Sequence, residues 1–176
     1  MKNILAIVVL SILFVGVINK PVFAQEKPIQ VALFNPVQIF PENTSITGLR
    51  LNIIYGKNVN VNGLDWGLIN STTGKQLGAQ WGFVNMVDNG FLGLQGGFVN
   101  LTNSKFEGLQ YGFINYHKGK VSGVQFGFIN YAGSMYGLQI GLINIINQGG
   151  AFPFFPITGL CRPEQCRGMG SAPACG

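Results

Sequence analysis

The chain has 176 residues and a formal net charge of +5, and only 10% of its residues are charged. Typical globular domains carry about 25% charged residues, and disordered chains combine high charge with low hydrophobicity, so this composition excludes a disordered chain. The length suffices for one domain with a core, and the scattered lysines argue against a nucleic-acid surface, which needs a clustered basic stripe.

Residues 1–24 have the pattern of a secretory signal peptide. Lys2 gives the positive start, residues 4–17 form an uncharged apolar run, and Val22, Phe23 and Ala24 make a small-x-small site before Gln25. The run is shorter than the ~20 residues that a membrane-spanning helix needs. We therefore predict cleavage after residue 24 and an exported mature chain.

Residues 25–47 are expected to form an N-terminal edge strand and a turn. Alternation over residues 29–40 indicates a strand, which Asn35 and Pro36 interrupt. Proline cannot donate a ladder hydrogen bond, so this strand belongs at a sheet edge. Residues 41–44 form a turn cluster.

Residues 48–150 repeat the unit G-L-Q-x-G-F-I-N seven times. Successive units are 15 residues apart five times and 14 residues apart once. Their opening residues are Gly48, Gly63, Gly78, Gly93, Gly108, Gly123 and Gly137. A fixed short period indicates one supersecondary unit used repeatedly, which favours a repetitive architecture over an irregular enzyme scaffold.

Counted from the opening glycine of each unit, positions 2, 4 and 6 carry large apolar residues, except for Ala79 at position 2 and Gly96 at position 4. Glycine occupies position 1 and most of position 5, and Gln occupies position 3 in most units. A period of two predicts a strand, and two glycines per eight residues would cost a helix about 1 kcal/mol each. We expect one face to hold Phe83, Phe98, Phe113, Phe128, Trp66, Trp81, Tyr111 and Phe126, and the other Gln80, Gln95, Gln110 and Gln125.

Two all-β arrangements fit these strands. We favour repeated antiparallel strands in an up-and-down meander or β-barrel, with turns near Gly74, Gly90, Ser104, Gly119 and Gly133, because large residues then oppose small ones. Strands with an apolar outside match an outer-membrane barrel. The alternative is a β-solenoid with one coil per 15-residue unit, which the near-constant period supports. Against the solenoid, position 4 carries Trp, Tyr or Phe, and the thin interior of a 15-residue coil can hardly hold these residues beside the apolar positions 7 and 9.

The repeat units and their flanks resemble a family of bacterial surface-repeat proteins built from G-L-Q-x-G-(L/F)-(V/I)-N motifs. The flanking matches are residues 36–42, residues 48–58 and the segment P-F-F-P-I at residues 153–157. The resemblance covers residues 30–157, and it implies a secreted or outer-membrane surface protein with no catalytic residues. The chain departs from the family pattern from Thr158 onwards.

Residues 151–157 form a closing aromatic segment, and residues 158–176 are expected to be a disordered tail. The three cysteines, Cys161, Cys166 and Cys175, all lie in this tail. No disulfide can therefore join the repeats, and the spacing C-x4-C-x8-C matches no zinc pattern.

The sequence offers no catalytic, cofactor-binding or metal-binding residues. His117 is the sole histidine, and we expect it in a solvated turn; the six acidic residues are scattered. No nucleophile triad, zinc motif or phosphate-binding loop is present.

We therefore expect a non-enzymatic exported surface or outer-membrane protein with a structural role, with outer-membrane lipid as its partner and no nucleic acid. The alternative is a secreted binding module, either adhesin-like or carbohydrate-binding, in which Gln at position 3 could contact sugar. A host or polysaccharide ligand stays open, and so do the periplasm and the medium as locations.

Overall fold

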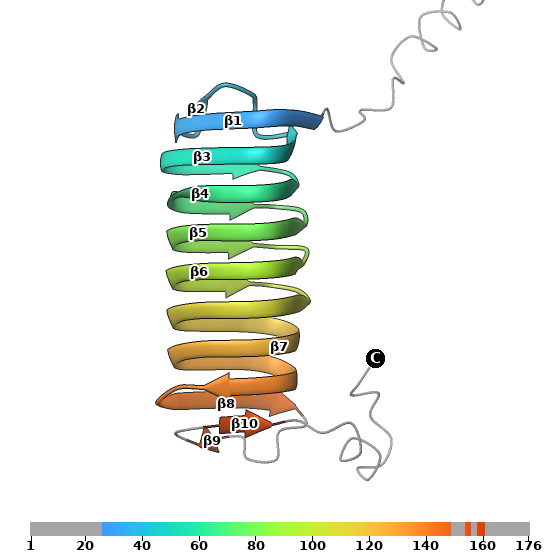
Figure 1. Ribbon diagram of the computed structural model, residues 1–176, viewed down its shortest axis with the longest axis vertical. Coiled ribbons are helices and arrows are strands. Elements are labelled where there is room, and N and C mark those ends of the chain that lie inside the picture. Colours follow the sequence, from blue (N-terminus) through green and yellow to red (C-terminus); the bar gives the residue numbers. More distant parts are fainter. Residues whose placement is uncertain (1–25, 149–153, 156–157, 161–176) are drawn as a thin grey trace, which may run out of the picture.

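The computed structural model describes residues 26–148, 154–155 and 158–160. These residues wind into a β-solenoid of about eight coils stacked along one axis (Figure 1). The strands are β1 Glu26–Phe34, β2 Val37–Gln38, β3 Ser45–Asn58, β4 Val61–Thr72, β5 Gln76–Val87, β6 Phe91–Thr102, β7 Phe106–Ile140, β8 Ile143–Gln148, β9 Phe154–Phe155 and β10 Thr158–Leu160. The all-β class and the solenoid alternative are confirmed.

Neighbouring coils pair in parallel and in register, so each position of the repeat lies beside the same position of the next coil. Gly78 pairs with Gly93 and Gln80 with Gln95, fifteen residues apart. The predicted antiparallel meander or barrel is therefore wrong. The objection to the solenoid fails because the aromatic residues at positions 4 and 6 point outward and do not fill its interior.

Each coil bends sharply at position 6 and is linked to the next coil at positions 11–13. The links at Gly74, Gly90 and Ser104 match the predicted turns. At Gly119 and Gly133 the expected turns are replaced by continuous strand, because both glycines lie within β7, which winds through more than two coils (Figure 1).

The opening glycine of each unit has a backbone conformation that other residues avoid. These glycines have φ between +103° and +146°. A Cβ atom at Gly108 would also overlap the carbonyl oxygen of Gly93 in the preceding coil. Both the positive φ and the close approach of the coils require glycine here.

The glycine at position 5 makes room for the asparagine at position 8. A Cβ atom on Gly112 would meet the side chains of Asn100 and Asn115. The first coil exchanges the two residues, because Asn52 pairs with Gly67 and Gly56 pairs with Asn70. In each coil, the glycine at one of these two positions therefore leaves space that the Asn side chain at the other position fills.

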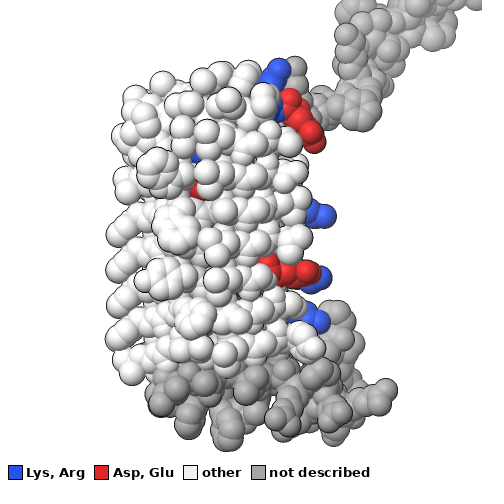
Figure 2. Space-filling model, viewed as in Figure 1, with Lys and Arg blue, Asp and Glu red and all other residues white. Residues whose placement is uncertain are grey.

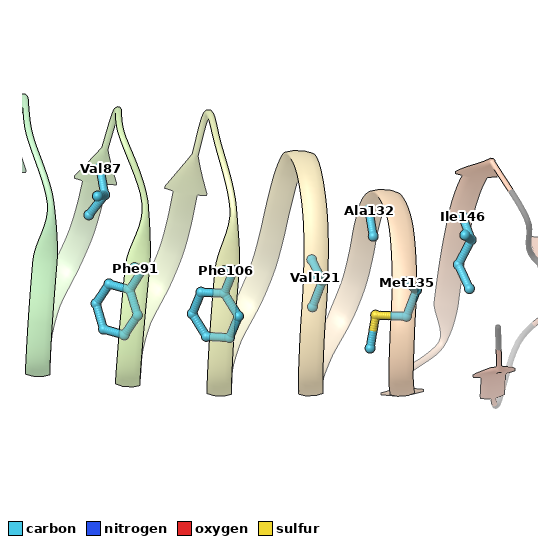
Figure 3. Packing of buried hydrophobic residues seen from close by; sticks show 7 residues of the cluster. All are labelled: Val87, Phe91, Phe106, Val121, Ala132, Met135 and Ile146. Atoms are coloured by element: carbon cyan, nitrogen blue, oxygen red, sulfur yellow. The ribbon is translucent and has the colours of Figure 1, made fainter. Parts of the chain in front are cut away.

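The apolar part of the interior lies beside the links between coils. Val87, Phe91, Phe106, Val121, Ala132, Met135 and Ile146 form one column along the axis (Figure 3). The Phe91 and Phe106 rings stack with their centroids 5.2 Å apart. This column occupies positions 10 and 14, with Met135 at position 13 of the shortened unit, and polar side chains take most of the remaining interior.

Both ends of the stack carry additional strands. At the N-terminal end β1 pairs in parallel with β3, and β2 pairs with β1. The Gln30 amide accepts a hydrogen bond from the Phe40 backbone N–H and donates one to its carbonyl, at 3.0 and 2.8 Å. At the other end β10 pairs antiparallel with β7, and β9 with β8.

Thr158–Leu160 was expected to begin the disordered tail, and it forms β10 instead. The rest of that tail, with its three cysteines, and the predicted signal peptide lie outside the described residues.

A matched pair of glycine substitutions separates backbone strain from coil spacing. Gly90 and Gly108 have φ of 130° and 131°, but an added Cβ at Gly90 would approach only the Lys105 carbonyl oxygen, at 3.4 Å. We expect Gly90→Ala to lower the free energy of unfolding by about 1–2 kcal/mol and Gly108→Ala by several kcal/mol. Urea unfolding measures both, and equal losses would contradict the proposed role of coil spacing.

Candidate functional site

Gln side chains at position 3 form a hydrogen-bonded ladder inside the solenoid. From Gln95 onwards, each donates from Nε2 to Oε1 of the Gln one coil earlier, at 2.7 Å, for example Gln110 to Gln95 and Gln125 to Gln110. The ladder includes Gln80, Gln95, Gln110, Gln125 and Gln139, all fully buried. These side chains are occupied with one another and do not reach the surface, so they cannot contact a sugar.

Asn side chains at position 8 form a second ladder that runs in the opposite direction. Each donates to the Asn of the following coil, as Asn85 does to Asn100 at 2.8 Å. The same Nδ2 also donates to a backbone carbonyl at position 4 of the next coil, as from Asn100 to Tyr111 at 3.0 Å. The second bond satisfies a carbonyl beside the sharp bend, where the inter-coil pairing skips position 6.

A buried ion pair stands where the two ladders begin. Arg50 donates from Nε and Nη2 to the two oxygens of Asp65, at 2.7 and 2.6 Å, and both side chains are fully buried. Asp65 also accepts from Gln80 and from Asn52. A carboxylate can only accept, so Asp65 makes both amides donate towards it and fixes the direction of both ladders.

His117 lies in the interior at position 10, so its expected placement in a solvated turn is wrong. Its Nε2 lies 3.0 Å from Nε2 of Gln110, and its ring packs edge-on against Phe106. Because Nε2 of Gln110 is a donor, Nε2 of His117 is the acceptor and the ring is neutral. Burial lowers the pKa of His117 from 6.5 to about 3. The misplaced expectation came from the neighbouring Lys118 and Gly119, which do belong to the link.

Outside the bend lies an exposed surface that we call the aromatic corner, formed by positions 4 and 6. The Phe rings at position 6 stack in a continuous column, with centroids 5.0, 5.0 and 4.8 Å apart. The aromatic residues of the corner, at positions 4 and 6, are between 38% and 61% exposed. Its aromatic members are Trp66, Trp81, Phe83, Phe98, Tyr111, Phe113, Phe126 and Phe128. The predicted division into an aromatic face and a Gln face is confirmed.

A groove runs along the aromatic corner between the two columns of side chains. Its volume is about 1220 Å³, and its floor is the backbone of Gly67, Gly82, Gly97, Gly112 and Gly127. At Gly96 the position-4 column lacks a side chain, and the Trp81 ring covers the gap. The chain's two tryptophans, Trp66 and Trp81, both line this groove.

Charged side chains gather on the opposite edge, at the links between coils. Most of the visible charges in Figure 2 lie along the right-hand edge, where Figure 1 draws the links. The link residues are Lys75, Asp88, Lys105, Glu107, Lys118 and Lys120, of which Lys105 and Glu107 form an ion pair. The solenoid is therefore amphipathic across its width.

Within the described part of the chain, no group of three His, Cys, Asp or Glu side chains could hold a metal. In the same residues, no helix is long and apolar enough to cross a membrane. Sequence reasoning missed the Arg50–Asp65 pair, although the exchange of Gln for charged residues at position 3 in two adjacent units was visible.

The ion pair can be tested by restoring the repeat consensus. Asp65→Gln leaves Arg50 buried without its partner, and we expect a loss of about 3–5 kcal/mol in the free energy of unfolding. The double variant Arg50→Gln/Asp65→Gln extends the Gln ladder and should regain most of that loss. Urea unfolding of both variants and the wild type decides it, and additive losses would contradict the pairing.

His117 should make stability depend on pH. Its pKa is about 3 in the folded chain, against an ordinary value of 6.5, so the unfolded chain binds the extra proton between these values. The free energy of unfolding is therefore not reduced by His117 above pH 6.5, and it falls by about 1.4 kcal/mol per pH unit as the pH drops from 6.5 towards 3. The variant His117→Thr, which copies Thr102 at the same position, should lack this component. If the free energy of unfolding of both proteins changed equally from pH 7 to pH 4, the proposed effect of His117 would be contradicted.

Comparison with known proteins gave no matching family model, no similar curated protein and no similar solved structure.

Proposed function

We propose that the chain is an exported, non-enzymatic protein with a structural role at the bacterial surface, attached to outer-membrane lipid through its aromatic corner. The supporting observation is the continuous apolar corner, which lies opposite a charged edge. The largest apolar patch on a typical soluble monomer covers about 300–600 Å², and larger patches mark interaction sites. Eight half-exposed aromatic side chains, each offering roughly 100 Å², exceed that range.

The chemistry of the groove favours hydrocarbon over sugar or peptide. The Phe rings at position 6 stack face to face, so they present mainly their edges. The Gln amides that could bind hydroxyl groups are buried in their ladder. A sugar would lose water without gaining matching hydrogen bonds, at a cost of about 1–3 kcal/mol per unpaired group.

A peptide strand also lacks a place to pair along this surface. The strands of β4, β5, β6 and β7 are hydrogen-bonded to a neighbouring coil on both sides. Only a partner without hydrogen-bonding needs can cover the corner at no such cost, and acyl chains meet this condition.

The two tryptophans make lipid attachment directly measurable. In the presence of lipid vesicles, we expect the tryptophan emission to shift to shorter wavelength and the protein to float with the vesicles. The variant Phe83→Thr/Phe98→Thr/Phe113→Thr should bind roughly fivefold more weakly for each Phe removed. Circular dichroism checks that the variant keeps its β structure.

Leu92→Thr is the matched control, because Leu92 is 50% exposed and Phe98 45%, but Leu92 lies next to the links. It should bind vesicles nearly as well as the wild type. Failure of the wild-type protein to float with any vesicle would contradict the proposed function.

A further inference from the structure

We propose that the solenoid lies edge-on within a single membrane leaflet, with the aromatic corner among the acyl chains near the bilayer midplane and the links at the phosphate headgroups. The inference rests on the proposed attachment to lipid and adds the depth and orientation of the molecule. It follows from four features of the described residues: the two flat sides, the satisfied backbone, the width of a coil and the position of the charges.

The apolar surface is not confined to the aromatic corner. On one flat side, position 2 carries exposed Leu64, Leu94 and Leu109. On the other side, positions 7 and 9 carry apolar side chains that are only half-buried. These are Val84, Met86, Val99, Leu101, Ile114, Tyr116, Ile129 and Tyr131. A molecule that touched lipid only through the corner would leave both sides in water.

The backbone along the two flat sides pairs its polar groups between coils, and at the bend Asn side chains pair with the position-4 carbonyls. Parallel pairing between coils engages both flat sides. At the bend, Asn85, Asn100 and Asn115 donate to the position-4 carbonyls of Gly96, Tyr111 and Phe126, at 2.8–3.0 Å. Because an unpaired backbone group in hydrocarbon costs several kcal/mol, this internal pairing is what immersion in lipid requires.

The width of a coil fits one leaflet. From position 14 to position 5 the strand takes six steps of about 3.3 Å, which places the links at most about 20 Å from the corner. The hydrocarbon core of a bilayer is about 30 Å thick, so one leaflet contributes about 15 Å. A coil therefore reaches from the headgroups to near the midplane and is too short to cross the bilayer.

The charges fit the headgroup level. The described links contain four lysines and two acidic residues. These are Lys75, Lys105, Lys118 and Lys120, and Asp88 and Glu107. This excess of positive charge complements anionic phosphate, and lysine side chains can extend towards it. The exposed charges stay in water while the corner is immersed.

The depth of the tryptophans decides the proposal. Wild type, Trp66→Phe and Trp81→Phe are bound to vesicles of phosphatidylcholine and phosphatidylglycerol that carry bromine either near the headgroup end or near the methyl end of the acyl chain. Edge-on insertion predicts stronger quenching of each tryptophan by bromine at the methyl end. Stronger quenching at the headgroup end overturns the insertion and leaves lipid attachment intact.

A second measurement tests the orientation. Lys75→Gln, Lys118→Gln and Lys120→Gln should each weaken binding to vesicles that contain phosphatidylglycerol, by roughly fivefold, and should not weaken binding to pure phosphatidylcholine. Equal binding of the variants and the wild type to both vesicles overturns the placement of the links at the headgroups.

Two further outcomes separate this proposal from the proposed function. Absence of both flotation and quenching removes lipid attachment and the orientation together. A stable dimer in sedimentation without lipid, with tryptophan emission already at short wavelength, assigns the corner to a second copy and overturns the insertion.

Discussion

Hydrogen bonding between identical amide side chains of successive coils is the interaction on which this structure depends. A Gln or Asn can both donate and accept, so a column of either can continue through any number of coils without an unpaired member. In a buried column a slipped register would leave donors and acceptors unmatched, which is costly away from water. The two ladders thereby stabilise a solenoid in which the described residues form one apolar column.

The same ladders explain how a protein can carry so many aromatic side chains outside. In most domains the large apolar residues fill the interior, but here glycine at positions 1 and 5 brings the coils close, and the space beside the position-5 glycines is taken by Asn side chains. The aromatic residues at positions 4 and 6 therefore lie outside, whereas Phe91 and Phe106 fit into the interior beside the links. The asparagines donate to backbone carbonyls at the bend from within, so these carbonyls are paired beneath the apolar side chains of the aromatic corner.

Much of this arrangement could be predicted from the sequence, and the stacking direction could not. The alternation of positions correctly separated Phe98 and Trp81 from Gln95, because side chains of a strand alternate whatever its partner. Antiparallel and parallel pairing both preserve that alternation, so the pattern alone did not distinguish them. The constant period was the better guide, since only a coil gives each position the same neighbour every time.

The site residues show the same limit. Arg50 and Asp65 are separated by one period, and their pairing follows once parallel register is known. The prediction for His117 was wrong because its neighbours in the sequence are link residues. Its burial depends on the parallel register, which places it beside Thr102 of the preceding coil. Residues whose environment comes from the stack, and not from adjacent sequence, are those that sequence reasoning misjudged.

The step of 14 residues between Gly123 and Gly137 has a consequence for how such a chain can change in length. Both ladders cross this shortened coil intact, with Gln139 donating to Gln125 at 2.7 Å and Asn130 to Asn144 at 2.8 Å. The missing residue is taken up in the link near Gly133. A link can therefore gain or lose a single residue, whereas the amide ladders can lengthen or shorten only by whole coils. The length of such a solenoid along its axis can therefore change only in steps of one coil, by the addition or removal of complete repeats.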